Sequence, residues 1–131
     1  MRVLSGREAS IFACLCDTVV APEPPLPPVA ETDAVDAFDR YLVGTPPLNR
    51  AGLRAMVHAA ELAPRLLGQG ARLRRLGGPE RGEALRRAEA SRAKPVVDVL
   101  EFVVRLSYFG DDSVMRLLGY DADANLRRAR R

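Results

Sequence analysis

The residue types that most often carry out chemistry are scarce in this sequence of 131 residues. His58 is its single histidine, and Cys14 and Cys16 are its two cysteines. Hydrolase triads and metal sites usually need a histidine with a second ligand or base close by, and no cysteine cluster or second histidine accompanies His58. We therefore expect His58 to be structural or solvent-exposed, and we expect no catalytic and no metal-binding residues in this chain.

The two cysteines lie two positions apart in a segment with helical spacing of apolar residues. At this separation the side chains point to nearly opposite faces of a helix, so they cannot pair with each other or share a metal ion. The sequence predicts that one of Cys14 and Cys16 is buried and the other partly exposed. A disulfide from the exposed cysteine to another chain is the less favoured alternative.

Two further patterns resemble cofactor or ion sites only in part. The stretch from Gly68 to Gly70 lacks the third glycine and the preceding strand of a phosphate-binding loop, so we interpret it as the end of a helix. Asp111 and Asp112 lack the spacing of a calcium-binding loop, and helix capping explains them. We expect this chain to bind no cofactor of its own.

The composition favours an all-α fold. Hydrophobic residues make up 47% of the chain, aromatic residues only 5%, and tryptophan is absent, which is typical of helical proteins rather than β-sandwiches or barrels. A chain of this length usually forms one domain. We predict a compact single-domain bundle of five to six helices over residues 1–126, followed by a basic tail over 127–131.

Local signals place the helices. Ser5 and Glu8 have the spacing of a capping box and predict a first helix from Gly6 to Val20. A second helix is expected between a cap at Thr32 or Asp33 and its end at Gly44. The remaining helices are expected over 49–67, from Pro79 to about Glu89, over 95–109 and over 114–118. The segment 95–109 is apolar on more than one face, so we expect a helix that is either central or covered on one face by a partner.

A proline-rich segment follows the first helix. Five prolines occur within residues 22–28, and this density predicts an extended, polyproline-like loop on the surface. Three tyrosines, at positions 41, 108 and 120, lie next to apolar residues and are expected in the core with the hydroxyl turned to a partner. The candidate contacts to a partner protein are Pro24, Pro25, Leu26, Pro27, Tyr108, Phe109 and Tyr120.

The charge of the chain supports a second, less favoured interpretation. The net charge is +3, and arginines cluster at 72–75, 86–87 and 127–131, which would suit a small basic helical protein that binds nucleic acid or acts as a regulator. Glu80, Glu83 and Glu89 alternate with these arginines, so the pattern fits a solvated helix face better and we do not expect nucleic acid as the partner.

No stretch approaches the ~20 apolar residues of a membrane span. The start shows no signal peptide, so we expect a cytoplasmic chain, with export alongside a partner left open.

Short motifs recur in an ordered set along most of the chain. They are Leu4-Ser5 with Glu8, the run from Asp17 to Pro22, the proline-rich segment, the run from Ser107 to Asp111, and the run from Leu118 to Asp121. This order resembles the gluconate 2-dehydrogenase subunit 3 family, the small subunits of membrane-linked flavin dehydrogenases.

The resemblance implies an accessory role. In that family the partner is a large flavoprotein of the glucose–methanol–choline type that holds FAD, and the small subunit assists its folding, stability or export without contacting substrate. Family members often begin with a twin-arginine signal, and this chain shows none. That difference implies a version that stabilises its flavoprotein in the cytoplasm, or one whose leader has been removed.

Overall fold

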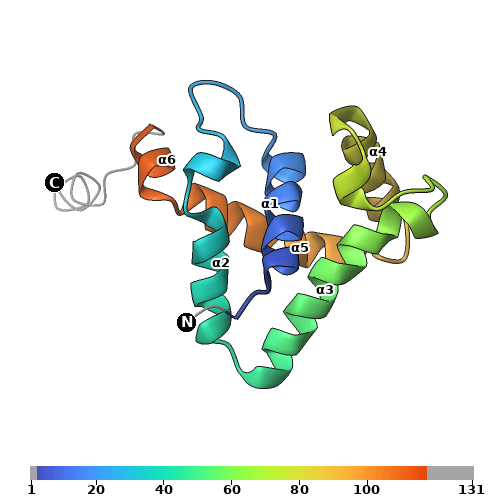
Figure 1. The fold of residues 1–131 in the computed structure, drawn as a ribbon, viewed down its shortest axis with the longest axis horizontal. Coiled ribbons are helices and arrows are strands. Elements are labelled where there is room, and N and C mark those ends of the chain that lie inside the picture. The colour runs from blue at the N-terminus through green and yellow to red at the C-terminus, as the bar shows by residue number, and fades with distance from the viewer. Residues whose placement is uncertain (1–2, 118–131) are drawn as a thin grey trace, which may run out of the picture.

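The computed structural model describes residues 3–117, and within that range it is all-α (Figure 1). The helices are α1 (Gly6–Val20), α2 (Ala34–Val43), α3 (Pro47–Leu66), α4 (Gly78–Glu89), α5 (Lys94–Phe109) and α6 (Asp112–Leu117), with 3-10 turns η1 (Val29–Glu31) and η2 (Leu73–Arg75). The predicted all-α bundle of five to six helices is thereby confirmed. The basic tail over 127–131 lies outside the described residues.

The first helix begins and ends as local chemistry dictates. The Ser5 hydroxyl accepts a hydrogen bond from the Glu8 amide at 3.1 Å, and the Glu8 carboxylate accepts one from the Ser5 amide at 2.9 Å. This capping box satisfies two amides that the first helical turn leaves unpaired. The helix stops at Ala21, which adopts a left-handed conformation with φ of 45° immediately before Pro22.

The other helix boundaries lie within two residues of the prediction, and the differences at the starts of α3 and α6 have identifiable reasons. α3 begins at Pro47, two residues before the expected start, because proline is well suited to the first turn of a helix. α6 begins at Asp112 rather than 114, because one carboxylate oxygen of Asp111 accepts hydrogen bonds from the amides of Ser113 and Val114 at 2.9 and 3.1 Å.

Helix α5 is the centre of the packing. It contacts α1, α2, α3, α4 and α6, and in Figure 1 it passes behind α1 with α2 on one side and α3 and α4 on the other. Its inward residues are buried against α1 and α2, where the rings of Phe12 and Phe38 stack with centroids 4.2 Å apart. The prediction of a central helix over 95–109 agrees with this arrangement.

Both cysteines lie inside this core. Cys14 is 7% exposed and Cys16 is fully buried, so the prediction of one partly exposed cysteine was wrong. The reason is that α1 is covered on several sides, by α2, α3, α4 and α5. Burial raises the pKa of the Cys14 thiol and raises that of Cys16 to about 12, so neither sulfur has the thiolate character that disulfide exchange requires.

Buried carboxylates hold the connecting segments onto the helices. The Asp39 carboxylate on α2 accepts hydrogen bonds from the amides of Val3 and Leu4, each at 2.8 Å. Asp111 likewise accepts one from the Asp33 amide at 2.9 Å, which connects the start of α6 to the start of α2. Each of these acids is less than a tenth exposed, and hydrogen bonds from backbone amides offset its loss of water.

Candidate partner-binding surface

Helix α5 presents a second apolar face to solvent. Val99, Phe102 and Leu106 lie at spacings of three and four residues, so they share one side of the helix. Phe102 is 67% exposed and Leu106 is 57% exposed, although residues on the opposite face of α5 are buried. Large apolar side chains exposed as a contiguous set are typical of interaction sites.

A groove lies beside this stripe, where α2, α3 and α5 meet. Its volume is about 460 Å³. Its walls are largely apolar, and Tyr41 of α2 stands at its edge with half of its surface exposed. We call this feature the α2–α5 groove; it is lined by Ala37, Arg40, Tyr41, Leu53, Val99, Phe102, Val103, Leu106 and Ser107.

The charged groups at the rim of the groove are already paired. Arg40 forms an ion pair with Asp33, with Nη2 and Oδ2 3.0 Å apart. Arg105, next to Leu106, forms an ion pair with Glu101, with Nη1 and Oε2 3.3 Å apart. Exposed pairs of this kind contribute little to stability. They do leave the rim close to electrically neutral, so apolar contact is the chief attraction that the groove offers to another protein.

The proline-rich segment is only partly available to a partner. Pro24 and Pro25 are exposed, whereas Leu26 and Pro27 are half-buried, and Leu26 packs against the core. The segment is held to α5 because the Tyr108 hydroxyl donates a hydrogen bond to the Pro27 carbonyl at 2.7 Å. Of the four residues predicted from this segment, Pro24 and Pro25 are the ones freely open to contact.

The aromatic candidates separate into different environments. Tyr108 is fully buried and its hydroxyl is used within the chain, so its selection as a partner contact was wrong. Phe109 is half-buried and packs edge-on against Tyr108, with ring centroids 5.1 Å apart. Tyr41, expected in the core, is instead exposed at the α2–α5 groove. Tyr120 lies outside the described residues.

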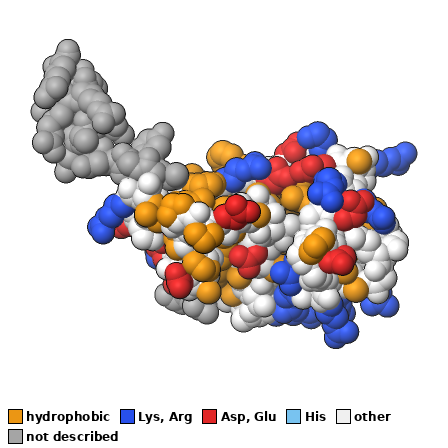
Figure 2. All heavy atoms as spheres, turned by 90° about the horizontal axis from the view of Figure 1, so that it is seen from above, with side chains coloured by type: hydrophobic (Ala, Val, Ile, Leu, Met, Phe, Trp, Pro, Cys, Tyr) orange, Lys and Arg blue, Asp and Glu red, His pale blue; other side chains and the backbone are white. Residues whose placement is uncertain are grey.

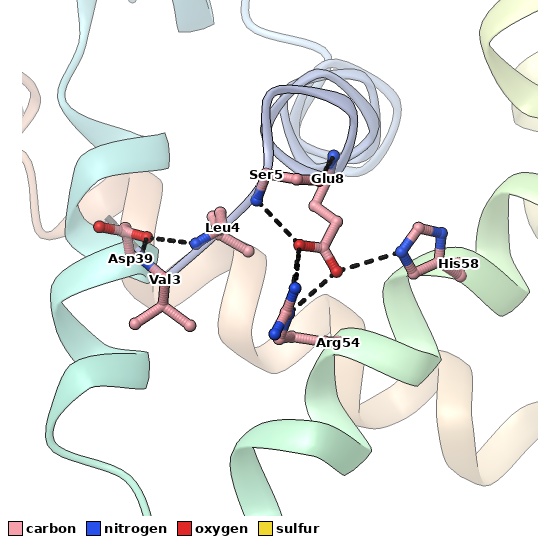
Figure 3. Close-up of polar contacts among 7 residues, drawn as sticks. All are labelled: Val3, Leu4, Ser5, Glu8, Asp39, Arg54 and His58. Atoms are coloured by element: carbon pink, nitrogen blue, oxygen red, sulfur yellow. Dashed lines mark hydrogen bonds and ion pairs between the residues drawn. The ribbon is translucent and has the colours of Figure 1, made fainter. Parts of the chain in front are cut away.

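The lone histidine belongs to a polar cluster that sequence spacing did not reveal (Figure 3). The carboxylate of Glu8, which caps α1, accepts hydrogen bonds from Nε and Nη2 of Arg54 at 2.9 to 3.1 Å. His58 lies one turn along α3, and its Nε2 is 3.1 Å from Oε2 of the same carboxylate. Figure 3 shows both α3 side chains pointing toward Glu8.

The chemistry of this cluster is that of a structural link. Burial by itself raises the pKa of the Glu8 carboxyl, but hydrogen bonds from Arg54, Ser5 and His58 outweigh burial and lower that pKa to about 2. Glu8 is therefore an anion whose oxygens are occupied, which suits it to joining α1 to α3. Among the described residues no group of His, Cys, Asp and Glu is arranged to hold a metal ion.

Sequence reasoning missed the groove because it depends on tertiary packing. Phe102 and Leu106 were identified only as part of an apolar helix, and no local signal says which face of that helix the other helices cover. Within residues 3–117 no helix is both long and apolar enough to cross a membrane.

The described residues thus form a helical domain with an exposed apolar groove between α2, α3 and α5. Comparisons with protein families, with curated proteins and with solved structures found no match.

Proposed function

We propose that this chain is a non-catalytic accessory subunit that binds and stabilises a FAD-dependent oxidoreductase of the glucose–methanol–choline type. The single observation that carries the proposal is the exposed apolar stripe of α5 beside the α2–α5 groove. The ordered motifs described above are what indicate a flavoprotein as the partner.

The physical basis is the free energy of covering apolar surface. Removing such surface from water stabilises an interface by about 25 cal/mol per Å². Aromatic anchors near the centre of an interface commonly dominate its affinity, and Phe102 is the most exposed of the large apolar side chains that line the groove. A partner that inserts an apolar side chain into the groove would cover Phe102, Leu106 and Tyr41 together.

In this proposal FAD belongs to the partner and the chain contacts neither FAD nor substrate. Its contribution is to cover a complementary apolar surface of the flavoprotein and so favour the folded, FAD-loaded state. Binding of this kind raises the apparent stability of the partner by mass action.

Co-expression tests the proposal. A large flavoprotein encoded next to this chain would be produced with and without it, and its soluble fraction, bound FAD per polypeptide and oxidase or dehydrogenase activity would be measured. We expect all three to be higher with the chain present. If the flavoprotein is equally soluble, FAD-loaded and active alone, the accessory role is wrong.

A further inference from the structure

A hollow at the connection between α3 and α4 carries three arginines. Arg65 lies in the last turn of α3, Arg72 directly precedes η2, and Arg75 ends η2. Together with Gly70 and Ala71 they line a hollow of about 230 Å³. The connection lies at the right of Figure 1, and Figure 2 shows Lys and Arg side chains gathered at that end of the molecule.

These three guanidinium groups have no hydrogen-bond or ion-pair partner within residues 3–117. Neighbouring arginines differ from them: Arg74 is paired with the buried Glu61, and Arg81 donates to backbone carbonyls of η2. Unpaired cations that face one hollow repel each other, and a bound anion would turn that repulsion into attraction.

The backbone of the hollow is also suited to an anion. Gly68 and Gly70 adopt left-handed conformations, with φ of 96° and 74°. The amides of Gly70 and Ala71 donate to no carbonyl among the described residues. Consecutive free amides around such a turn form a concavity that binds anions.

Two carbonyls at the nearby end of α3 already have donors, which weakens the opposition of this helix end to an anion. The carbonyl end of a helix carries partial negative charge, which would oppose an anion. Here the Gln69 amide donates to the Pro64 carbonyl at 2.8 Å, and Arg87 donates to the Leu67 carbonyl at 3.4 Å. These carbonyls are therefore already paired with donors.

We propose that this hollow binds the phosphate group of a small molecule. A phosphate monoester carries about −1.5 to −2 charges at pH 7 and several acceptor oxygens, which three guanidinium groups and two amides can match. The planar guanidinium of arginine can bind phosphate through two parallel hydrogen bonds, a bidentate geometry that lysine lacks. The hollow is larger than one phosphate, so the rest of the ligand would lie toward its open side. The inference is independent of the flavoprotein partner.

The test is a titration of the chain with inorganic phosphate, in which the amide NMR signals of Gly70 and Ala71 report binding. We expect these signals to shift and to saturate. In a chain carrying both Arg72→Gln and Arg75→Gln, the dissociation constant should rise by at least about tenfold. A matched control carries Arg92→Gln and Arg116→Gln, which remove two exposed arginines elsewhere, and should bind phosphate like the wild type.

Two sources of the phosphate group are separated by sedimentation with vesicles that contain phosphatidic acid. Binding of free phosphate without vesicle association indicates a soluble ligand. Vesicle association that the Arg72→Gln and Arg75→Gln changes abolish indicates a lipid headgroup in the same site. The proposal is overturned if Gly70 and Ala71 do not respond to phosphate, if the double variant responds equally, or if an oligonucleotide binds and phosphate does not.

Discussion

At the scale of single residues, the fold depends on a few buried carboxylates that connect distant segments. Glu8 links the start of α1 to Arg54 and His58 on α3, and Asp111 links the start of α6 to Asp33. Both acids have a lowered pKa because hydrogen bonds to the carboxylate outweigh the effect of burial. The native state therefore favours their charged forms, which makes its stability dependent on pH.

We predict that Glu8→Gln destabilises the chain by about 2 to 3 kcal/mol at pH 7, because it removes a buried anion held by charged hydrogen bonds. Urea unfolding measures the change. Glu83→Gln is the control, because Glu83 also forms ion pairs with two arginines but is half-exposed, and this change should destabilise the chain much less. Equal losses in the two variants would show that the Glu8 cluster is not a structural link.

The pH dependence follows from the same carboxylate. The pKa of Glu8 is about 2 in the folded chain and 4.5 for an unperturbed glutamate, so the unfolded state binds the proton more readily. Its stabilising contribution is complete above about pH 4.5 and is lost as the pH falls toward 2. The urea concentration at the midpoint of unfolding should fall less steeply between pH 7 and pH 2.5 in Glu8→Gln than in the wild type. Parallel declines would contradict the assignment.

A third prediction concerns the buried tyrosine. Tyr108→Phe removes the hydroxyl that donates to the Pro27 carbonyl and should lower the free energy of unfolding by about 1 kcal/mol. Tyr41→Phe, at an exposed tyrosine, should leave it unchanged. Thermal unfolding of both variants checks the difference, and an unchanged melting temperature for Tyr108→Phe would mean that this bond does not hold the proline-rich segment in place.

At the scale of elements, the sequence indicated where helices lie better than which faces they expose. Capping boxes and prolines act within a few residues of themselves, so the bounds of α1 matched and those of α3 and α6 were close. The Glu8–Arg54 contact spans 46 positions, and no local pattern could predict it. The sequence could not predict which face of α5 is exposed either, because a helix that is apolar on more than one face does not indicate which side its neighbours leave uncovered.

The packing between the described helices leaves a small apolar gap. An apolar hollow of about 80 Å³ lies between α1, α3, α4 and α5, with several alanines in its walls. We predict that Ala88→Leu fills part of this space and stabilises the chain by about 1 kcal/mol. Calorimetry measures the melting temperature, and Ala90→Leu on the exposed side at the end of α4 serves as control. A lower melting temperature for Ala88→Leu alone would show that the helices cannot accept the larger side chain.

At the scale of the whole molecule, apolar and basic features lie toward different ends. Hydrophobic side chains gather at the left of Figure 2, whereas Lys and Arg side chains are more frequent at the right. The α2–α5 groove and the arginine hollow are built from different residues. A protein partner and a phosphate group could therefore be bound together, and a variant in one site should leave the other unaffected.

The central claim is that the α2–α5 groove binds the flavoprotein, and the affinity of the purified pair measured by calorimetry tests it most directly. We predict that Phe102→Glu weakens binding by about 2 kcal/mol, or about thirtyfold, because it places a charge in a desolvated apolar contact. Leu66→Glu replaces a leucine that is 81% exposed on α3, outside the groove, and should bind like the wild type. Unchanged affinity in Phe102→Glu, or an equal loss in Leu66→Glu, would contradict the claim.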